Sequence, residues 1–394
     1  MTGVRTAPAA PAQRRVRGFV SIVVPCRNEE LTIGEFVDWC WQGLQAAGAE
    51  GEVIIVDNST DRSPEIAREH GARVIHEAER GLGRAYVAAV PHIRGDYVVM
   101  GDCDLTYDFR ELGGFLQALD DGAEFVMGTR LKGSIEPGAM PRLHRYFGTP
   151  VTTWILNRLY RQRFSDIHCG MRAMTIAALR RIDIQSPGWE YASEMVLKAA
   201  KLRLRTTEVP VRFLRDREGR ESHHRRAGWR SPWKAGWDNL KVMFLYAPEA
   251  LLLVPGLLLL VPGLVLSAAL VGGPIDVGRF SLSLNWSLLG LAAATIGYTL
   301  VWLSVLARVH TDLDPAYTDR KLRRWSFDRG ASAAFLLAAA GVVLNAILVA
   351  TWISQGFALG EIYHPVVFGL LLVVLGFQTF AFTLLLTIVA PKRA

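Results

Sequence analysis

The architecture of this chain can be worked out from Asp96-Tyr-Val-Val-Met-Gly-Asp-Cys-Asp104. The apolar run Tyr97–Met100 predicts a buried β-strand, and Gly101 lets the backbone turn after it. Asp102 and Asp104 then stand at the carboxyl end of that strand, the edge where open α/β sheets bind ligands. Two carboxylate ligands that leave room for water and phosphate suit Mg²⁺ or Mn²⁺ holding a diphosphate. The alternative is a loop with two solvated aspartates.

Strands and helices alternate around this stretch, which predicts an α/β fold with a mainly parallel sheet. Strands are expected at Phe19–Pro25, Glu52–Val56, Ala72–His76 and Tyr97–Met100, and helices at Glu29–Ala47, Pro64–His70, Gly83–Ile93, Val151–Leu159 and Tyr191–Lys201. Because the carboxyl ends of parallel strands meet at one edge, the polar residues that follow three of these strands are expected to form one site.

The polar strand ends are Arg27-Asn-Glu29, Asp57-Asn-Ser59 and Asp102-Cys-Asp104. Asp57 directly follows a buried apolar run, whereas residues 59–61 equally suit a turn followed by a helix cap. A further segment, Arg80-Gly-Leu-Gly-Arg-Ala85, places two glycines before a helix, an arrangement that commonly binds anions. Gly83 and Arg84 are therefore candidate contacts of a diphosphate.

The second half of the chain has a different composition. After Pro248, the stretches without Lys, Arg, Asp or Glu are 250–275, 280–307, 330–360 and 362–391. Each exceeds the roughly 20 apolar residues that cross a bilayer as a helix, and four such lengths in succession are not typical of a soluble core. Transmembrane helices are predicted near 250–271, 286–307, 331–353 and 366–390.

Basic residues predict the orientation of these helices. The loop after the second predicted helix carries Arg308, Arg320, Lys321, Arg323, Arg324 and Arg329, whereas the loop at 354–365 has no Lys or Arg. The N-terminal domain and both termini are therefore expected on the cytoplasmic side of the cell membrane. Residues 212–241 are basic, with tryptophans at 229, 233 and 237, which predicts an interfacial helix; packing against the domain is the alternative.

The charge and the cysteine spacing give no reason to expect a nucleic-acid-binding, disulfide-rich or zinc-binding protein. The 394 residues carry a formal net charge of +7, and because this charge gathers beside the predicted membrane, no nucleic-acid partner is needed to explain it. The four cysteines lie far apart, as expected for reduced thiols rather than disulfides or a zinc site. The expected domains are a disordered basic tail at 1–18, an α/β domain at 19–225, an interfacial segment at 226–248 and four transmembrane helices at 249–394.

Several segments together resemble a known enzyme family. Val23-Val-Pro-Cys-Arg-Asn-Glu-Glu30, Val56-Asp-Asn-Ser-Thr-Asp61 and Gly101-Asp-Cys-Asp104 resemble the motifs of family 2 glycosyltransferases of the GT-A fold. Three later motifs resemble those of polyprenyl-phosphate glycosyltransferases, which include the dolichol-phosphate mannose and glucose synthases. These motifs are Gly128-Thr-Arg130, Asp166-Ile-His-Cys-Gly-Met-Arg172 and Glu190-Tyr-Ala-Ser-Glu194. The resemblance covers about 19–225.

The resemblance implies roles for the matched residues. The donor nucleotide sugar would be bound by Pro25, Asn28, Glu29, Asp57, Gly83, Arg84, Asp102, Cys103 and Arg217. Asp102 and Asp104 would hold Mg²⁺ or Mn²⁺ on the diphosphate. The acceptor phosphate would be bound by Arg130, Lys132 and Arg172, and the catalytic residues would be Asp104, Arg130, Asp166 and Arg172. Asp166 would orient Arg172 or the acceptor, or cap the turn that follows it.

Two segments depart from the family pattern. The position after the aspartate pair that usually holds Gln is Thr106. The family segment Arg, then Gly-x-Ser-Lys, is here Arg217-Glu-Gly-Arg-Glu-Ser-His-His224, which is one residue longer and has His in place of Lys. Arg217 is therefore the least well matched of the donor-binding candidates.

The implied reaction is an inverting transfer of a hexose from a nucleotide sugar to a polyprenyl phosphate, and both UDP-glucose and GDP-mannose suit the sequence as donors. A second hypothesis is transfer to a glycolipid or polysaccharide acceptor. A third is a catalytically silent GT-A module that serves as a membrane scaffold, against which the intact pair of Asp102 and Asp104 argues. Membrane lipids are expected partners, and the transmembrane helices allow lateral association into a homo-oligomer.

Overall fold

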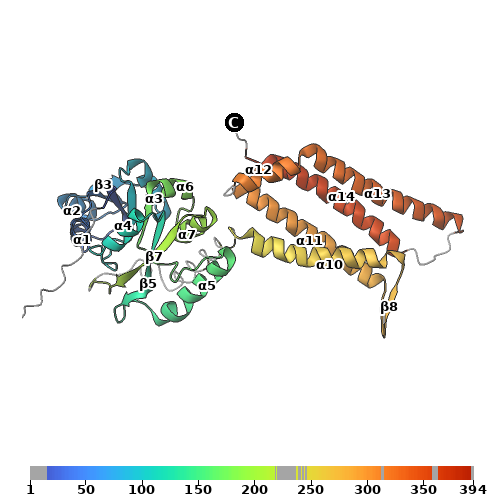
Figure 1. The fold of residues 1–394 in the computed structure, drawn as a ribbon, viewed down its shortest axis with the longest axis horizontal. Coiled ribbons are helices and arrows are strands. Elements are labelled where there is room, and N and C mark those ends of the chain that lie inside the picture. The colour runs from blue at the N-terminus through green and yellow to red at the C-terminus, as the bar shows by residue number, and fades with distance from the viewer. Residues whose placement is uncertain are drawn as a thin grey trace, which may run out of the picture. The chain divides into compact units, whose positions relative to one another are not determined.

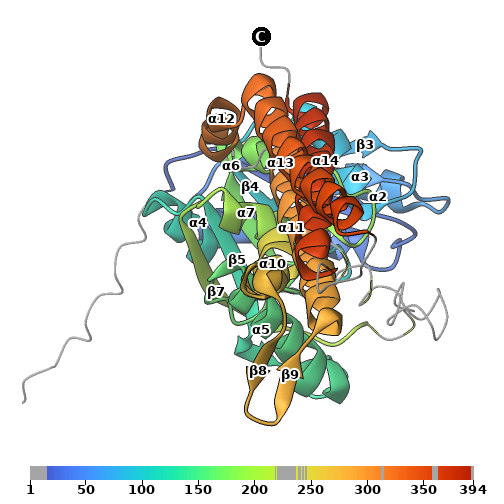
Figure 2. The same cartoon turned by 90° about the vertical axis from the view of Figure 1, so that its right-hand side faces the viewer.

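The computed structural model describes residues 16–217, 219, 237, 241, 244, 246–311, 315–356 and 363–391. The chain divides into two compact units, Met1–Tyr246 and Ala247–Ala394. Both units are drawn in Figure 1 and, turned by 90°, in Figure 2. The predicted interfacial helix with its tryptophan stripe falls mostly outside the described residues.

The first unit is built around a seven-stranded sheet in the order β3-β2-β1-β4-β6-β5-β7. The strands are β1 (Val20–Cys26), β2 (Gly51–Asp57), β3 (Arg73–His76), β4 (Tyr97–Met100), β5 (Phe125–Ile135), β6 (Arg172–Thr175) and β7 (Thr206–Phe213). The strands pair in parallel, except that β6 runs antiparallel to both β4 and β5. Since β6 is reversed, the segment before it lies at the carboxyl ends of the other strands.

Helices surround this sheet, and Figure 1 shows α5 at the periphery of the unit, beyond β5. They are α1 (Ile33–Ala46), α2 (Ser63–Glu69), α3 (Leu82–Ala89), α4 (Gly113–Asp120), α5 (Thr149–Tyr160), α6 (Ile176–Ile182) and α7 (Tyr191–Lys201), with short helical turns η1 (Val90–His92) and η2 (His144–Gly148). The central strands carry runs of buried Val and Ile, as expected for parallel strands covered on both faces.

The predicted α/β fold is confirmed, with corrected element ends. Residues Tyr97–Met100 and Tyr191–Lys201 form a strand and a helix as predicted. The first helix begins at Ile33 rather than Glu29, because Asn28 has a positive φ of 54° and residues 29–32 form a turn. The third helix gives way to the turn η1 at Val90, since Pro91 cannot continue the α-helical hydrogen bonding.

As predicted, the described residues of the second unit include four helices long and apolar enough to cross a membrane. These spans are Glu249–Gly272, which includes η3 (Glu249–Leu253) and α10 (Val254–Ala269), then α11 (Leu284–Thr311), α13 (Phe327–Ser354) and α14 (Tyr363–Val389). A hairpin of β8 (Ile275–Val277) and β9 (Phe280–Leu282) joins the first two spans, and α12 (Pro315–Arg324) lies between the second and third.

Small residues and polar side chains join the spans. A Cβ added at Gly297 of α11 would lie 2.3 Å from the backbone nitrogen of Leu260, so glycine allows α10 and α11 to approach closely. Tyr298 Oη lies 2.6 Å from Thr379 Oγ1 of α14. Arg308 near the end of α11 pairs with Glu249 at 3.1 Å. This ion pair places the entry to the first span and the exit of the second at the same end of the unit.

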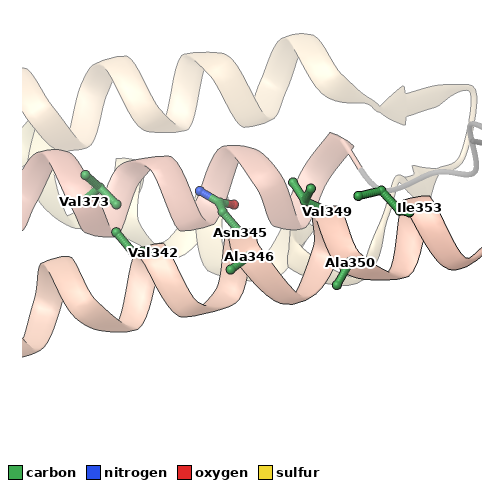
Figure 3. Close-up of a pocket in the computed structure, with 7 residues that line it drawn as sticks. All are labelled: Val342, Asn345, Ala346, Val349, Ala350, Ile353 and Val373. Carbon is green, nitrogen blue, oxygen red and sulfur yellow. The ribbon is translucent and has the colours of Figure 1, made fainter.

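An apolar groove of about 510 Å³ runs between α13 and α14 (Figure 3). Its lining comes from α13 between Val342 and Ile353 and from Val373 of α14, with Asn345 as the polar lining residue. A Cβ at Gly369 would lie 2.4 Å from Asn345 Oδ1, so the glycine makes room for the amide. All residues that line the groove belong to the second unit.

Candidate active site at the carboxyl edge of the sheet

The two aspartates that follow β4 are held in a fixed turn. Asp104 Oδ1 accepts hydrogen bonds from the backbone nitrogen of Thr106 at 3.0 Å and from its hydroxyl at 2.5 Å. Between the aspartates, the buried Cys103 thiol donates to the carbonyl oxygen of Pro25 at 3.3 Å. Thr106, which replaces the Gln of the family pattern, therefore orients Asp104. The bond from Cys103 connects the turn to the end of β1.

A second segment approaches this turn from the loop before β6. A Cβ added at Gly170 would lie 2.4 Å from Asp102 Oδ2 and 3.0 Å from the ring of Tyr107. The Gly170 backbone N–H donates to Tyr107 Oη at 2.8 Å, and Tyr86 donates to the carbonyl oxygen of Gly101 at 3.0 Å. Sequence reasoning missed these two tyrosines and Gly170, because no spacing or composition marks residues that support a turn formed elsewhere in the chain.

The donor atoms at this edge suit a hard divalent cation. Asp102 and Asp104 are partly buried carboxylates separated by one residue. Within the described parts of the chain, no group of three or more His, Cys, Asp or Glu residues is placed to hold a metal ion. A cation bound by this pair would therefore keep coordination positions for water or phosphate, and the predicted Mg²⁺ or Mn²⁺ site stays a prediction.

Polar residues at the ends of β1 and β2 lie next to this turn. Asn28 Oδ1 accepts from the backbone nitrogen of Thr60 at 2.8 Å, and the buried Glu29 donates through its backbone nitrogen to Ser63 Oγ at 2.9 Å. These bonds tie the two strand ends together. Asp61 Oδ1 accepts from the backbone nitrogen of Ser63, which supports the turn, but the N-cap of α2 is Arg62 and no side chain caps this helix.

Asp57 differs from these neighbours because one of its oxygens has no partner. Its side chain is buried, and Oδ2 accepts from the backbone nitrogen of Ser59 at 3.2 Å. Oδ1 is buried without a hydrogen-bond partner among the described residues. A buried carboxylate oxygen without a donor is costly, so this atom marks a position where a bound molecule would supply an N–H or O–H group.

The glycine Gly83, in the first turn of α3, serves close packing. A Cβ at Gly83 would lie 1.8 Å from the carbonyl oxygen of Ser186, and the Arg84 backbone nitrogen donates to Pro187 at 3.2 Å. The Arg84 guanidinium pairs with Glu79 and lines a hollow of about 410 Å³. Part of the predicted anion-binding helix terminus is therefore occupied by a carbonyl, and the donor role of Gly83 and Arg84 stays a prediction.

Arg130 and Asp166 form a buried two-point ion pair. Arg130 Nε donates to Asp166 Oδ2 at 2.7 Å and its Nη2 donates to Oδ1 at 2.9 Å. Asp166 is fully buried, whereas Arg130 keeps 9% of its surface exposed. Asp166 Oδ1 also accepts from the backbone nitrogen of His168 at 3.1 Å. The prediction that Asp166 orients Arg172 is thus corrected to Arg130, and the turn-capping role is confirmed.

Electrostatics hold this pair ionised. Burial alone raises the pKa of Asp166, but the hydrogen bonds and charge of Arg130 outweigh burial and leave that pKa below its ordinary value. Burial lowers the pKa of the neighbouring His168 to about 4, so this imidazole is neutral at physiological pH. His168 Nε2 lies 2.8 Å from Thr152 Oγ1, so this side chain joins the loop to α5.

Arg172 begins β6 and is only 1% exposed. Its guanidinium donates to the carbonyl oxygens of Ala192 at 2.9 Å and Cys169 at 3.0 Å, and Nε is buried without a partner among the described residues. Burial raises the pKa of Tyr191 to about 12, with Arg172 and Asp102 acting in opposite directions. Arg172 therefore lies near the carboxylates as a buried positive charge, and its predicted contact with phosphate stays a prediction.

The remaining basic candidates contact carboxylates. Lys132 of β5 donates to Glu208 Oε2 at 2.7 Å and is half exposed. Arg217 pairs with Glu35 of α1. Glu194, which belongs to a family-like motif, is buried and accepts from the Ser186 backbone nitrogen at 2.7 Å and from Lys198 at 2.6 Å. Glu194 thus stabilises the loop that packs on α3.

Comparisons with known proteins cover both units. Residues 21–186 match the profile of Glycosyl transferase family 2, and residues 305–390 match the Glycosyltransferase family 2 C-terminal transmembrane region. The low-salt glycan biosynthesis hexosyltransferase Agl6 of Haloferax volcanii is 35% identical over 365 residues, which cover 91% of this chain and 86% of that protein. The dolichyl-phosphate hexose transferase of the same organism is 34% identical over 204 residues, which cover 51% of this chain and 84% of that protein.

A solved structure is also similar to part of this chain. Glucosyl-3-phosphoglycerate synthase from Mycobacterium tuberculosis, in complex with phosphoglyceric acid, aligns with a TM-score of 0.47 and 19% sequence identity. The alignment covers 58% of this chain and 79% of that one.

Proposed function

This chain belongs to glycosyltransferase family 2, and from that premise we propose that it transfers a hexose from a nucleotide sugar to a polyprenyl phosphate at the membrane. The observation that carries the proposal is the pair of Asp102 and Asp104 at the carboxyl edge of the sheet, beside the loop before β6, whose Asp166 pairs with Arg130 of β5. The same chain contains four apolar helices that suit a lipid substrate. The names of two relatives, a hexosyltransferase and a dolichyl-phosphate hexose transferase, support the same activity.

The nucleotide of the donor is proposed to lie over the ends of β1 and β2. Asp57 Oδ1 accepts an N–H of the base, which satisfies a buried oxygen that has no hydrogen-bond partner among the described residues. Pro25, Asn28 and Glu29 form the loop beside it. Uracil and guanine both present ring N–H groups, so UDP-glucose and GDP-mannose both remain suitable donors.

Replacing Asp57 with alanine is expected to weaken donor binding by roughly 10- to 100-fold, because a hydrogen bond to a charged group contributes about 1.5–3 kcal/mol. Isothermal titration of the full-length protein with UDP-glucose and GDP-mannose measures the change. The Asp61→Ala variant is the control, since Asp61 accepts only from neighbouring loop atoms. Equal losses in the two variants would contradict a direct contact from Asp57.

Next along the edge, Asp102 and Asp104 are proposed to bind the diphosphate through Mg²⁺ or Mn²⁺. When bound, such a cation stabilises the negative charge that develops on the leaving diphosphate. The residues of the chain fix the geometry: Thr106 orients Asp104, and the backbone of Gly170 lies against Asp102.

Replacing Gly170 with alanine is expected to weaken Mn²⁺ and nucleotide binding together by at least about tenfold, a free-energy change of roughly 1.4 kcal/mol. The new methyl group would overlap Asp102 Oδ2 and must displace that carboxylate. Gly113→Ala is the matched control, because nothing lies within 4 Å of a Cβ at that position. Electron paramagnetic resonance of free Mn²⁺ gives both affinities. Unchanged Mn²⁺ binding in Gly170→Ala would remove Asp102 from the proposed cation site.

The acceptor is a phosphate monoester and is already anionic, so no strong general base is needed. One of its oxygens attacks the anomeric carbon and forms the new C–O bond. The bond from that carbon to the diphosphate breaks, and the nucleoside diphosphate leaves with the electron pair, which inverts the configuration. Arg130 is the proposed phosphate contact, because Asp166 engages its Nε and Nη2 and makes no hydrogen bond to Nη1. Lys132 and Arg172 add positive charge nearby.

The catalytic unit and both termini are proposed to lie on the cytoplasmic side. The entry to the first span and the exit of the second share one end of the membrane unit, through Glu249 and Arg308. The basic helix α12 follows that exit, which places its arginines and lysine on the same side, in agreement with the positive-inside rule.

Full-length protein in nanodiscs, given labelled UDP-glucose or GDP-mannose, undecaprenyl phosphate and Mn²⁺, tests the proposal. Transfer of label to the lipid phosphate supports it, and mass analysis of the product identifies the hexose. Transfer only to an added glycolipid would favour the alternative acceptor. Absence of transfer with every donor and acceptor would favour a membrane scaffold.

A further inference from the structure

An exposed apolar stripe runs along η2 and α5 of the first unit. Leu143, Phe147, Val151 and Trp154 follow one another at intervals of four, four and three residues, which places them on one face of a helix. They are 37–66% exposed, and Tyr146 beside them is 71% exposed. A helix on the surface of a soluble domain normally turns polar residues outward, so this face requires a partner.

The opposite face of α5 is already in use. Thr149, Thr153 and Leu156 are buried against the unit. The residues of the exposed stripe are therefore not the ones that attach α5 to the core, because other residues of the helix are buried there. Figure 1 shows α5 at the periphery of the first unit.

The charge around the stripe identifies the chemistry of the partner. Residues 137–165 contain no Asp or Glu but five arginines, namely Arg142, Arg145, Arg158, Arg161 and Arg163. In the described parts of the chain, none of the five pairs with a carboxylate. One of them, Arg145, lies 5.5 Å from the centre of the Tyr146 ring. Aromatic and apolar residues surrounded by unpaired arginines match an anionic bilayer surface, with its apolar interior and phosphate headgroups.

We propose that η2 and α5 form a membrane-docking surface that inserts its stripe among anionic lipid headgroups. This proposal rests on the four membrane spans and does not depend on the transfer reaction. A lipid surface is favoured over a protein partner because the chain is anchored in a bilayer by its own second unit, and because the local charge is entirely positive.

Docking would position the active-site loop. Asn157 of α5 bonds to both the backbone nitrogen and the carbonyl oxygen of Phe164, at 3.0 and 2.7 Å. Thr152 contacts His168, whose backbone bonds to Asp166. The loop that holds Arg130 is thus attached to the inward side of α5, so contact of the outward side with headgroups sets the height of this loop above the bilayer.

Nitroxide labels test the proposal in nanodiscs of phosphatidylcholine and phosphatidylglycerol. Trp154→Cys and Phe147→Cys report on the stripe, and Leu31→Cys is the control, since Leu31 is 64% and Trp154 66% exposed. The four native cysteines are buried and leave the introduced thiol as the accessible one. Power saturation then compares accessibility to oxygen, which partitions into lipid, with accessibility to a water-soluble nickel chelate.

Labels at 154 and 147 are expected to be at least about threefold more accessible to oxygen than to the nickel chelate, relative to the label at 31. An Arg142→Glu/Arg158→Glu background should shift the stripe labels toward the aqueous value. Labels at 147 and 154 that match the control would overturn the proposal. Labels protected from both reagents would also overturn it, because they would show the stripe packed against protein, either another part of this chain or a second copy.

Discussion

Hexose transfer is expected to fall by at least about 10³-fold when Asp102 and Asp104 are both replaced by alanine. The cation held by this pair would supply several kcal/mol of transition-state stabilisation, and each 1.4 kcal/mol is a factor of ten in rate. The rate of label transfer to lipid phosphate at saturating donor gives the change. Because Asp102 and Asp104 are only partly buried, the double variant should retain the circular dichroism spectrum of the unmodified protein.

A matched control and a second measurement separate catalysis from folding. Asp121→Ala removes an exposed aspartate at the end of α4 that accepts from Gln117, away from the sheet edge. It should transfer hexose at the normal rate. Mn²⁺ binding should disappear in the double variant and persist in the control. Normal transfer by the double variant would overturn the proposed mechanism, whereas loss of the folded spectrum would call for Asp102→Asn and Asp104→Asn instead.

The second large effect is expected at the buried ion pair. Asp166→Ala leaves the Arg130 guanidinium buried without its carboxylate, and breaking such a pair costs about 3–5 kcal/mol. For a unit of this size, that loss corresponds to a decrease in Tm of roughly 6–20 °C. Tryptophan fluorescence in detergent follows the transition. Asp166→Asn keeps the shape and some hydrogen bonds, so its Tm should lie between those of the alanine variant and the unmodified protein.

Lys132→Ala is the control for Asp166→Ala. Lys132 of β5 also pairs with a carboxylate, that of Glu208 on the neighbouring strand β7, but it is half exposed, and surface pairs contribute at most about 1 kcal/mol. A Tm decrease in Lys132→Ala equal to that in Asp166→Ala would contradict the argument from burial.

The pH dependence of the Asp166 effect follows from its pKa, which lies below the ordinary value in the folded protein. The unfolded chain binds the proton more tightly than the folded chain. The stabilisation is therefore complete above the ordinary aspartate pKa of about 4 and is lost as pH falls through the lower folded value. The difference in Tm between Asp166→Ala and the unmodified protein should be constant from pH 8 to pH 5 and shrink only in stronger acid.

The fold could be predicted from the sequence because the signals for strands, helices and membrane spans did not conflict with one another. The runs of Val and Ile specified buried parallel strands, Tyr97–Met100 to the residue, and long uncharged stretches specified the four spans. Element ends were less accurate where one residue overrides the pattern, as at Asn28 with its positive φ and at Pro91.

The internal contacts of the site were only partly accessible to sequence reasoning. Asp102 and Asp104 stood out because two carboxylates follow an apolar strand. That Asp166 would bind Arg130 rather than Arg172 depends on how the loop returns to the sheet, which no local pattern encodes. Gly170 and Tyr107 support the turn through a hydrogen bond between residues that are 63 positions apart in the sequence. Such contacts follow from tertiary packing and leave no periodic signal.

The reversal of β6 has a consequence for how this enzyme can diversify. Residues 136–171 leave the sheet after β5 and return to it at β6, so both ends of this excursion lie at the same edge. An excursion of this kind can be lengthened, shortened or exchanged between homologues without altering the register of the strands on either side. Selection can therefore alter the surroundings of Asp166 and Gly170 by editing one insert, while the ends of β1 and β2 are inherited intact.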